Sequence, residues 1–86
     1  MQTSPQSAVL YCDGASKGNP GPAGAGFVLR TPDGDLIARD AIPLGRATNN
    51  VAEYQGLIAG LHEASARGIK HLSIMSDSEL IVRQLN

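Results

Sequence analysis

The stretch that most constrains the fold of this chain is an apolar run that ends on a carboxylate and leads directly into turn-forming residues. Residues 8–12 are rich in strand formers and are followed by Asp13. Glycine and proline then recur over residues 14–24, which predicts a loop. The pattern therefore predicts a strand over residues 8–13 with Asp13 at its carboxyl end, where open α/β sheets place their ligand chemistry. Taken alone, the position fits an aspartate that caps the following turn equally well.

The segments that follow predict a mixed sheet covered by helices. Alternating apolar residues predict two more strands, over 25–31 and 35–42, joined by a tight Pro-Asp-Gly turn. Apolar residues at helical spacing predict a helix over residues 50–66, which includes Gly56 and Gly60. Glycines four residues apart share one helix face, so we expect that face to pack closely on the sheet.

A fourth strand is predicted over residues 71–76, and a second helix begins at residue 78. The order is β-β-β-α-β-α. Three antiparallel strands come first, and a right-handed crossover through the helix would lay the fourth strand parallel to the first. The fold class is thus α/β, and the mixed apolar character of residues 8–13 predicts a central strand covered on both faces.

Length and composition limit the classes of function. The 86 residues predict one domain over residues 8–86, preceded by a flexible tail over residues 1–7. A net charge of −1 indicates no global attraction to nucleic acid or to a membrane surface. No apolar run approaches the roughly 18 residues of a membrane span. Because Cys12 is the single cysteine and can form no internal disulfide, we expect a reducing, cytoplasmic compartment. The lack of a membrane span leads us to expect no membrane partner.

Three carboxylates follow or begin the predicted elements. Asp13 and Asp77 follow the first and fourth strands, whose ends should lie side by side, and Glu53 lies near the start of the helix. Clustered hard oxygen ligands of this kind suit Mg²⁺ or Mn²⁺. Each helix start also fits a capping box, with Asn50 three residues before Glu53 in one and Ser76 three residues before Glu79 in the other.

Three stretches, residues 13–24, 48–54 and 76–82, closely resemble the three successive motifs of type 1 ribonuclease H. The resemblance implies a ribonuclease H-like fold and an endonuclease that hydrolyses the RNA strand of RNA–DNA hybrids with two divalent metal ions, Mg²⁺ or Mn²⁺. It implies that Asp13, Glu53 and Asp77 are the catalytic, metal-binding carboxylates.

The resemblance also implies which residues contact the hybrid. Asn19, Asn49 and Asn50 match positions that contact the nucleic-acid backbone in the family. Amides suit this role because they can donate to and accept from a 2′-hydroxyl, the group that distinguishes RNA from DNA. Backbone N–H groups around Gly14 and Ala15 could serve in the same way.

The chain departs from the family pattern at its end. We expect the C-terminal strand and helix of the fold to be absent, together with a fourth carboxylate, and Glu79 replaces a common glutamine. The fourth strand would then be an open edge that favours self-association or a complementing segment. A non-catalytic hybrid-binding or chain-complementing fragment is therefore the alternative function. A flavodoxin-like nucleotide-binding domain fits the element order but explains neither the carboxylates nor the opening antiparallel strands.

Overall fold

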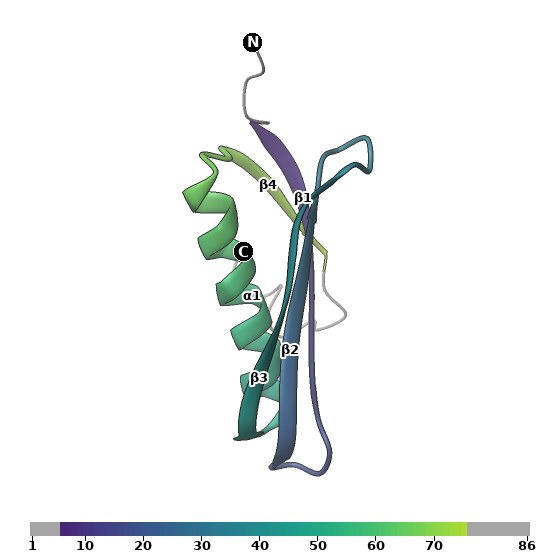
Figure 1. Ribbon diagram of the computed structural model, residues 1–86, viewed down its shortest axis with the longest axis vertical. Coiled ribbons are helices and arrows are strands. Elements are labelled where there is room, and N and C mark those ends of the chain that lie inside the picture. The colour runs from purple at the N-terminus through teal and green to yellow at the C-terminus, as the bar shows by residue number, and fades with distance from the viewer. Residues whose placement is uncertain (1–5, 76–86) are drawn as a thin grey trace.

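Four strands and one helix form over residues 6–75, the part of the chain that the computed structural model describes (Figure 1). The expected second helix, from residue 78, lies outside these residues. The described elements are β1 (Ser7–Ser16), β2 (Gly21–Arg30), β3 (Leu36–Ala47), α1 (Asn49–Ala66) and β4 (His71–Met75).

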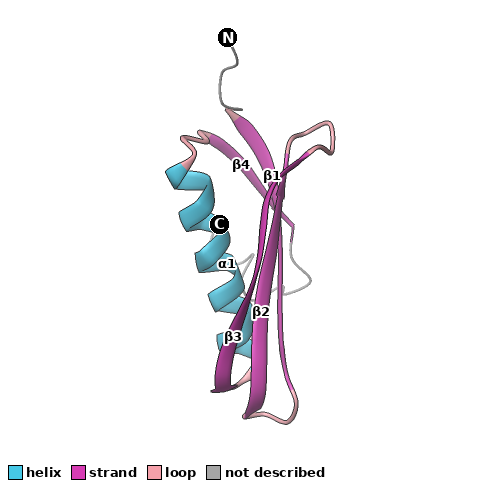
Figure 2. Ribbon diagram, viewed as in Figure 1, coloured by secondary structure: helices cyan, strands magenta, loops and turns pink. Residues whose placement is uncertain are grey.

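The sheet has the predicted mixed topology, with strand order β3-β2-β1-β4 (Figure 2). Strand β1 pairs antiparallel with β2, and β2 pairs antiparallel with β3. Helix α1 then crosses over one face of the sheet, and β4 pairs parallel with β1. This arrangement confirms the expected α/β class, and β1 and β2 each pair with two strands and contact the helix.

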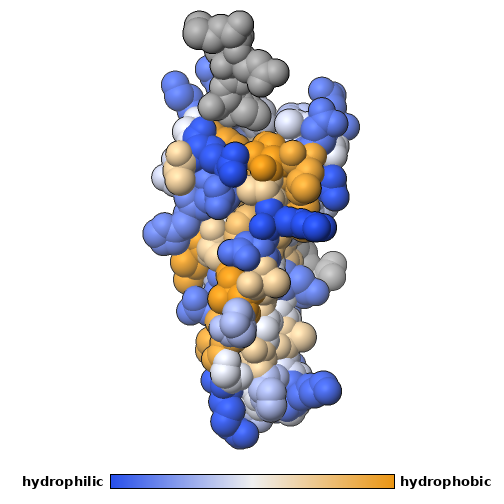
Figure 3. Space-filling view, in the orientation of Figure 1, coloured by the Kyte–Doolittle hydropathy of each residue, from blue (hydrophilic) through white to orange (hydrophobic). Residues whose placement is uncertain are grey.

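The core lies between α1 and one face of the sheet. Leu10 and Leu29 are opposite each other on β1 and β2 and are fully buried, with Phe27 beside them and Leu57 above them on α1. Burying side chains of this size is the main source of stability in a small domain. Figure 3 shows that apolar surface remains along the side where the helix and sheet meet, between hydrophilic ends.

The opposite face of the sheet is open in the described part of the chain. Tyr11 on β1 is 44% exposed and Met75, its partner on β4, is 54% exposed. The expectation that β1 is covered on both faces is therefore wrong for residues 6–75, because α1 is the one helix in this range and it packs on the Leu10 side. No helix among these residues has the length and apolar character needed to cross a membrane.

Glycines set how closely α1 approaches β1. A Cβ added at Gly56 would lie 2.8 Å from the Asp13 carbonyl oxygen, and one at Gly60 would lie 2.4 Å from the Leu10 Cδ1 atom. Both distances are too short for real side chains, so the predicted role of these glycines is confirmed. The buried helix face is centred on small residues, and the apolar side chains of Val51 and Ile58 are 46% and 43% exposed.

The strands extend further than the sequence pattern predicts. The expected loop over residues 14–24 is wrong, because β1 continues to Ser16 and β2 starts at Gly21, which leaves only residues 17–20 as the turn. Small residues pair across these extensions, which propensity alone disfavours but tertiary pairing supports. Gly18, at a φ of +89°, supplies the left-handed backbone of the turn.

Two other boundaries also change. Strand β3 runs to Ala47, beyond the expected strand end at residue 42, and it passes through Pro43 and Gly45 with a register shift at Ala23 and Gly24 of β2. At the other end, the Gln6 carbonyl oxygen accepts hydrogen bonds from the backbone N–H groups of residues 70 and 71, at 2.9 and 3.0 Å. Ser7, the last residue of the expected tail, therefore belongs to β1, and Gln6 is hydrogen-bonded to the start of β4.

Candidate functional site

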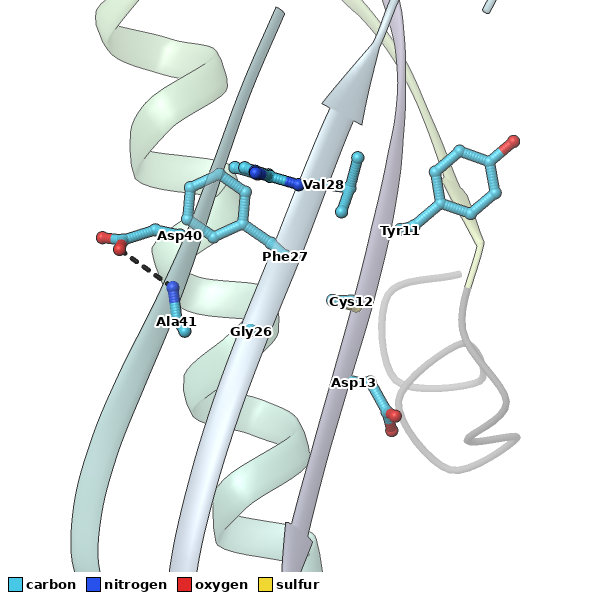
Figure 4. Close-up of a pocket in the computed structure, with 9 residues that line it drawn as sticks. Tyr11, Cys12, Asp13, Gly26, Phe27, Val28, Asp40 and Ala41 are labelled. Atoms are coloured by element: carbon cyan, nitrogen blue, oxygen red, sulfur yellow. Dashed lines mark hydrogen bonds between the residues drawn. The ribbon is translucent and has the colours of Figure 1, made fainter. Parts of the chain in front are cut away.

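Asp13 lies on β1, on the face of the sheet away from α1. It pairs with Gly26 and is followed by three more residues of the strand, so its expected place at the strand end is wrong. Figure 4 shows its carboxylate and the Tyr11 ring on the same side of β1, with Phe27 pointing the other way. The exposed Asp13 carboxylate accepts a hydrogen bond through Oδ1 from the Gly14 N–H, at 2.8 Å, which leaves Oδ2 open to solvent.

Glu53 lies in the first part of α1, where the helix backbone touches β1. A Cβ added at Gly14 would lie 2.3 Å from the carbonyl carbon and oxygen of Ala52 and 2.6 Å from the Glu53 nitrogen. The residue that follows Asp13 therefore packs backbone to backbone on the residue that precedes Glu53. This contact brings together the first and second predicted carboxylate positions, which are 40 residues apart in the sequence.

The capping explanation for Glu53 is wrong. Thr48 is the N-cap of α1, and its side-chain oxygen accepts a hydrogen bond from the Val51 N–H at 3.2 Å. Asn50 is therefore inside the helix and does not cap it, and Glu53 lies beyond the third helical position that a capping box requires. Glu53 is half-buried, and its side chain forms no ion pair or hydrogen bond within residues 6–75.

The third predicted carboxylate, Asp77, lies outside the described residues. Strand β4 ends its described part at Met75, which pairs in parallel with Tyr11, two residues before Asp13. Among residues 6–75, no group of three or more His, Cys, Asp or Glu side chains is arranged to hold a metal ion. Of the three expected ligands, Asp13 and Glu53 lie in the described part of the chain, and their role in metal binding stays a prediction.

The predicted substrate-contact asparagines meet at the junction of the β1–β2 turn and α1. The Asn49 N–H donates to the Asn19 Oδ1 at 3.0 Å, across 30 residues of sequence. The Asn49 Oδ1 in turn accepts hydrogen bonds from the backbone N–H of Ser16, at 2.8 Å, and from its hydroxyl, at 2.9 Å. Asn50 is exposed and makes no side-chain hydrogen bond within residues 6–75.

The two remaining predicted contact residues differ in what they offer. The Gly14 N–H is already donated to Asp13, and the residue is wedged against α1, so its backbone serves the site by close packing. Ala15 is exposed on the same face as Asp13 and pairs with Gly24 on β2. Shallow hollows flank Asp13 on this face, and they are lined by residues of β1, β2 and β3 that include Tyr11, Gly26, Val28, Arg39, Ala41 and Pro43.

Sequence reasoning missed Ser16 and Thr48. Thr48 precedes Asn49 and Asn50, and all three residue types are good helix caps, so the sequence gives several candidates in a row. Ser16 lay inside the expected loop, and no spacing or motif indicated a separate role for its side chain. The signal that could have found it is its place in the alternation of β1, two residues beyond Gly14 on the face that meets α1.

Comparison with known proteins places this geometry in a family. A family model described as "Reverse transcriptase-like" matches residues 11–86. The chain is 49% identical over 79 residues to the bifunctional protein Rv2228c of Mycobacterium tuberculosis, and 49% identical over 75 residues to a ribonuclease HI of Halobacterium salinarum. These matches cover 91% and 87% of this chain, but 22% and 38% of the two relatives.

Solved structures agree in fold. The N-terminal RNase H domain of Rv2228c superposes with a TM-score of 0.89 at 49% identity, and LC11-RNase H1, solved in complex with an RNA/DNA hybrid, with a TM-score of 0.83 at 40% identity. The superpositions cover 92% and 91% of this chain, and 61% and 59% of those structures. The chain therefore belongs to the reverse transcriptase-like family, and its fold matches that of the ribonuclease H domains in these structures.

Proposed function

We propose that the protein is a metal-dependent endonuclease that hydrolyses the RNA strand of an RNA–DNA hybrid. The observation that carries the proposal is the backbone contact of Gly14 with Ala52 and Glu53, which holds Asp13 and Glu53 on adjoining elements. The names of the relatives support the activity, and one related structure was solved with an RNA/DNA hybrid. The chain covers 61% and 59% of these related structures, and the proposal concerns the activity of the whole protein.

The donor set fits a hard divalent cation. Asp13 keeps one carboxylate oxygen open to solvent, and the half-buried Glu53 carboxylate forms no ion pair with any residue in the range 6–75. Asp13 and Glu53 lie on adjoining elements, and neither forms an ion pair within residues 6–75. Carboxylates without a cationic partner are stabilised by a bound cation. We infer that Asp13, Glu53 and Asp77 together hold two Mg²⁺ or Mn²⁺ ions.

The bound ions would supply an activated water and neutralise charge on the scissile phosphate and the leaving 3′ oxygen. The residues of the chain would do the rest. Asp13, on a central strand, and Glu53, on a helix packed against that strand, would fix the ion positions through rigid elements. Asn19 and Asn49 would hold the nucleic acid at the junction of the β1–β2 turn and α1.

A cleavage assay tests the proposal. The full-length protein is incubated with an RNA–DNA hybrid, double-stranded DNA or double-stranded RNA, each with Mg²⁺, Mn²⁺ or EDTA. We expect cleavage of the RNA strand of the hybrid alone, dependent on the metal. Asp13→Asn, Glu53→Gln and Asp77→Asn should each lower kcat at least about a hundredfold, because a lost metal ligand removes transition-state stabilisation.

Asp40 provides a matched control for Asp13. Its Oδ1 accepts a hydrogen bond from the N–H of the next residue, Ala41, at 2.9 Å, and it is exposed on a strand, as Asp13 is. Asp40 also lines one of the hollows beside Asp13, but it pairs with Phe27 and so lies on the opposite face of the sheet from Asp13. Asp40→Asn should therefore leave kcat within about twofold of the wild type. Normal cleavage by a folded Asp13→Asn variant would refute the metal-site assignment. Binding of hybrid without any cleavage would instead support the non-catalytic alternative.

A further inference from the structure

A closed ring of hydrogen bonds joins the β1–β2 turn to the start of α1. Ser16 donates to Asn49 through its N–H and its hydroxyl, and Asn49 donates to Asn19 through its backbone N–H. Asn19 follows Gly18 in the turn, and the Gly18 carbonyl oxygen accepts a hydrogen bond from the Ser16 hydroxyl. Ser16 is the member of this ring that contacts both the turn and the helix.

The ring fixes which way each asparagine amide faces. A backbone N–H can only donate, so the Asn49 atom that faces the Ser16 N–H must be the amide oxygen. The same reasoning applies to Asn19, whose amide oxygen faces the Asn49 N–H. Both Nδ2 groups are thereby directed away from these partners, and within residues 6–75 neither makes a hydrogen bond.

We propose that Ser16 is a positioning residue for hybrid binding, which orients the Asn49 amide so that its Nδ2 group is presented as a donor. This inference rests on the proposed function, and it adds a residue that none of the sequence motifs singled out. The Ser16 hydroxyl has one proton and two acceptors, Gly18 O and Asn49 Oδ1. The hydroxyl therefore links the position of the turn to the orientation of the Asn49 amide. With the Ser16 N–H as the single donor, the amide could rotate about that one hydrogen bond.

The consequence is an effect on affinity with little effect on chemistry. Ser16 lies three residues beyond Asp13 and makes no hydrogen bond to Asp13 or Glu53. Removing its hydroxyl leaves the Gly14 contact with α1 intact, so the metal-binding carboxylates stay in place. The loss should therefore appear in KM and in the Kd for hybrid, and kcat should change little.

Three variants of the full-length protein test this inference. Ser16→Ala should raise KM for hybrid about three- to tenfold, the effect of one neutral hydrogen bond, with kcat within about twofold of the wild type. Ser16→Thr keeps the hydroxyl and suits the end of a strand, so it should restore KM to within about twofold. Ser65→Ala is the matched control, because Ser65 is exposed on α1 and its hydroxyl makes no hydrogen bond in the described part of the chain.

A binding measurement separates affinity from turnover. Fluorescence anisotropy with a labelled hybrid, in an Asp13→Asn background, should show the same three- to tenfold weakening for Ser16→Ala and none for Ser65→Ala. An unchanged KM and Kd in Ser16→Ala, an equal loss in Ser16→Thr, or a fall in kcat that matches the rise in KM would each overturn the inference. If the wild-type protein neither binds nor cleaves hybrid, the proposed function and this inference both fail; if it does both, Ser16→Ala tests the inference alone.

Discussion

The contact at Gly14 makes a prediction with two readouts. A methyl group at this position would lie 2.3 Å from the Ala52 backbone and 2.6 Å from the Glu53 nitrogen, whereas ordinary contact begins near 3.4 Å. Backbone atoms cannot turn aside as a flexible side chain can, so α1 and β1 must move apart by about 1 Å in Gly14→Ala. The strand that carries Asp13 and the helix that carries Glu53 then separate.

Stability and activity should both fall, by amounts that the geometry sets. Overpacking of this kind costs about 1–3 kcal/mol of the free energy of unfolding, which urea denaturation measures. A displacement of about 1 Å between groups that must act together can cost about a hundredfold in rate. We therefore expect kcat for hybrid cleavage to fall about a hundredfold in the fraction of Gly14→Ala that remains folded.

Gly24 is the matched control. It lies opposite Ala15 in the same strand pair, and a Cβ there would meet its nearest atom, the Ile42 carbonyl oxygen, at 3.6 Å, an ordinary contact. Gly24→Ala should be neutral or stabilising by about 0.4–1 kcal/mol, because it lowers the entropy of the unfolded chain. If Gly14→Ala is as stable and as active as Gly24→Ala, the reasoning that this backbone contact positions the two carboxylates is refuted.

Two further predictions concern the start of α1. Thr48→Ala should lower the free energy of unfolding by about 1 kcal/mol, because it removes the N-cap acceptor. Asn50→Ala should change the free energy of unfolding by less than about 0.5 kcal/mol. Urea denaturation of the two variants shows which of the two residues caps the helix. Asn49→Asp keeps the oxygen that accepts from Ser16 but replaces the Nδ2 donor, so stability should stay within about 0.5 kcal/mol of the wild type while anisotropy shows hybrid binding weakened about tenfold. Equal binding by Asn49→Asp and the wild type would show that the donor is not used.

The topology could be predicted from the sequence because local patterns and connection rules agree. The Pro-Asp-Gly turn between two alternating runs defines the β2–β3 hairpin. Because a helix follows, a right-handed crossover that places β4 parallel to β1 is the favoured connection. The close packing at Gly56 and Gly60 was also predictable, since two glycines one turn apart inside a helix are costly unless another element lies against them.

The strand ends were not predictable from local patterns. Glycine and proline between residues 14 and 24 have low strand propensity, yet β1 and β2 extend across this range. Their small side chains are needed because α1 begins directly above them, which is a tertiary condition. The same condition explains why Val51 and Ile58 are exposed although they fit the apolar period: the helix rests on its glycines, so the larger residues beside that line are turned away from β1.

The candidate site was predicted by residue type, but its internal order was not. The amide hydrogen bonds among Asn19, Asn49 and Ser16 span 30 and 33 residues of sequence. No periodicity relates such positions, so only the fold reveals that these three residues form one unit. The expectation that each asparagine both donates to and accepts from a 2′-hydroxyl changes for Asn49, because its amide oxygen already accepts two hydrogen bonds from Ser16. The Asn19 oxygen accepts one hydrogen bond and keeps a second lone pair.

Two kinds of contact, one steric and one hydrogen-bonded, therefore have different roles at the junction of β1 and α1. The contact at Gly14 is steric and involves only backbone atoms, so it tolerates no side chain and sets the spacing of Asp13 and Glu53. The ring around Ser16 consists of neutral hydrogen bonds, each worth about 0.5–1.5 kcal/mol, so its members can change with graded effects. A steric contact suits catalytic geometry, where errors of 1 Å are costly, and a hydrogen-bonded ring suits affinity, which can vary over an order of magnitude without loss of the reaction. Substitutions at Gly14 should thus act on kcat and substitutions at Ser16 on KM, although the two residues are neighbours on one face of one strand.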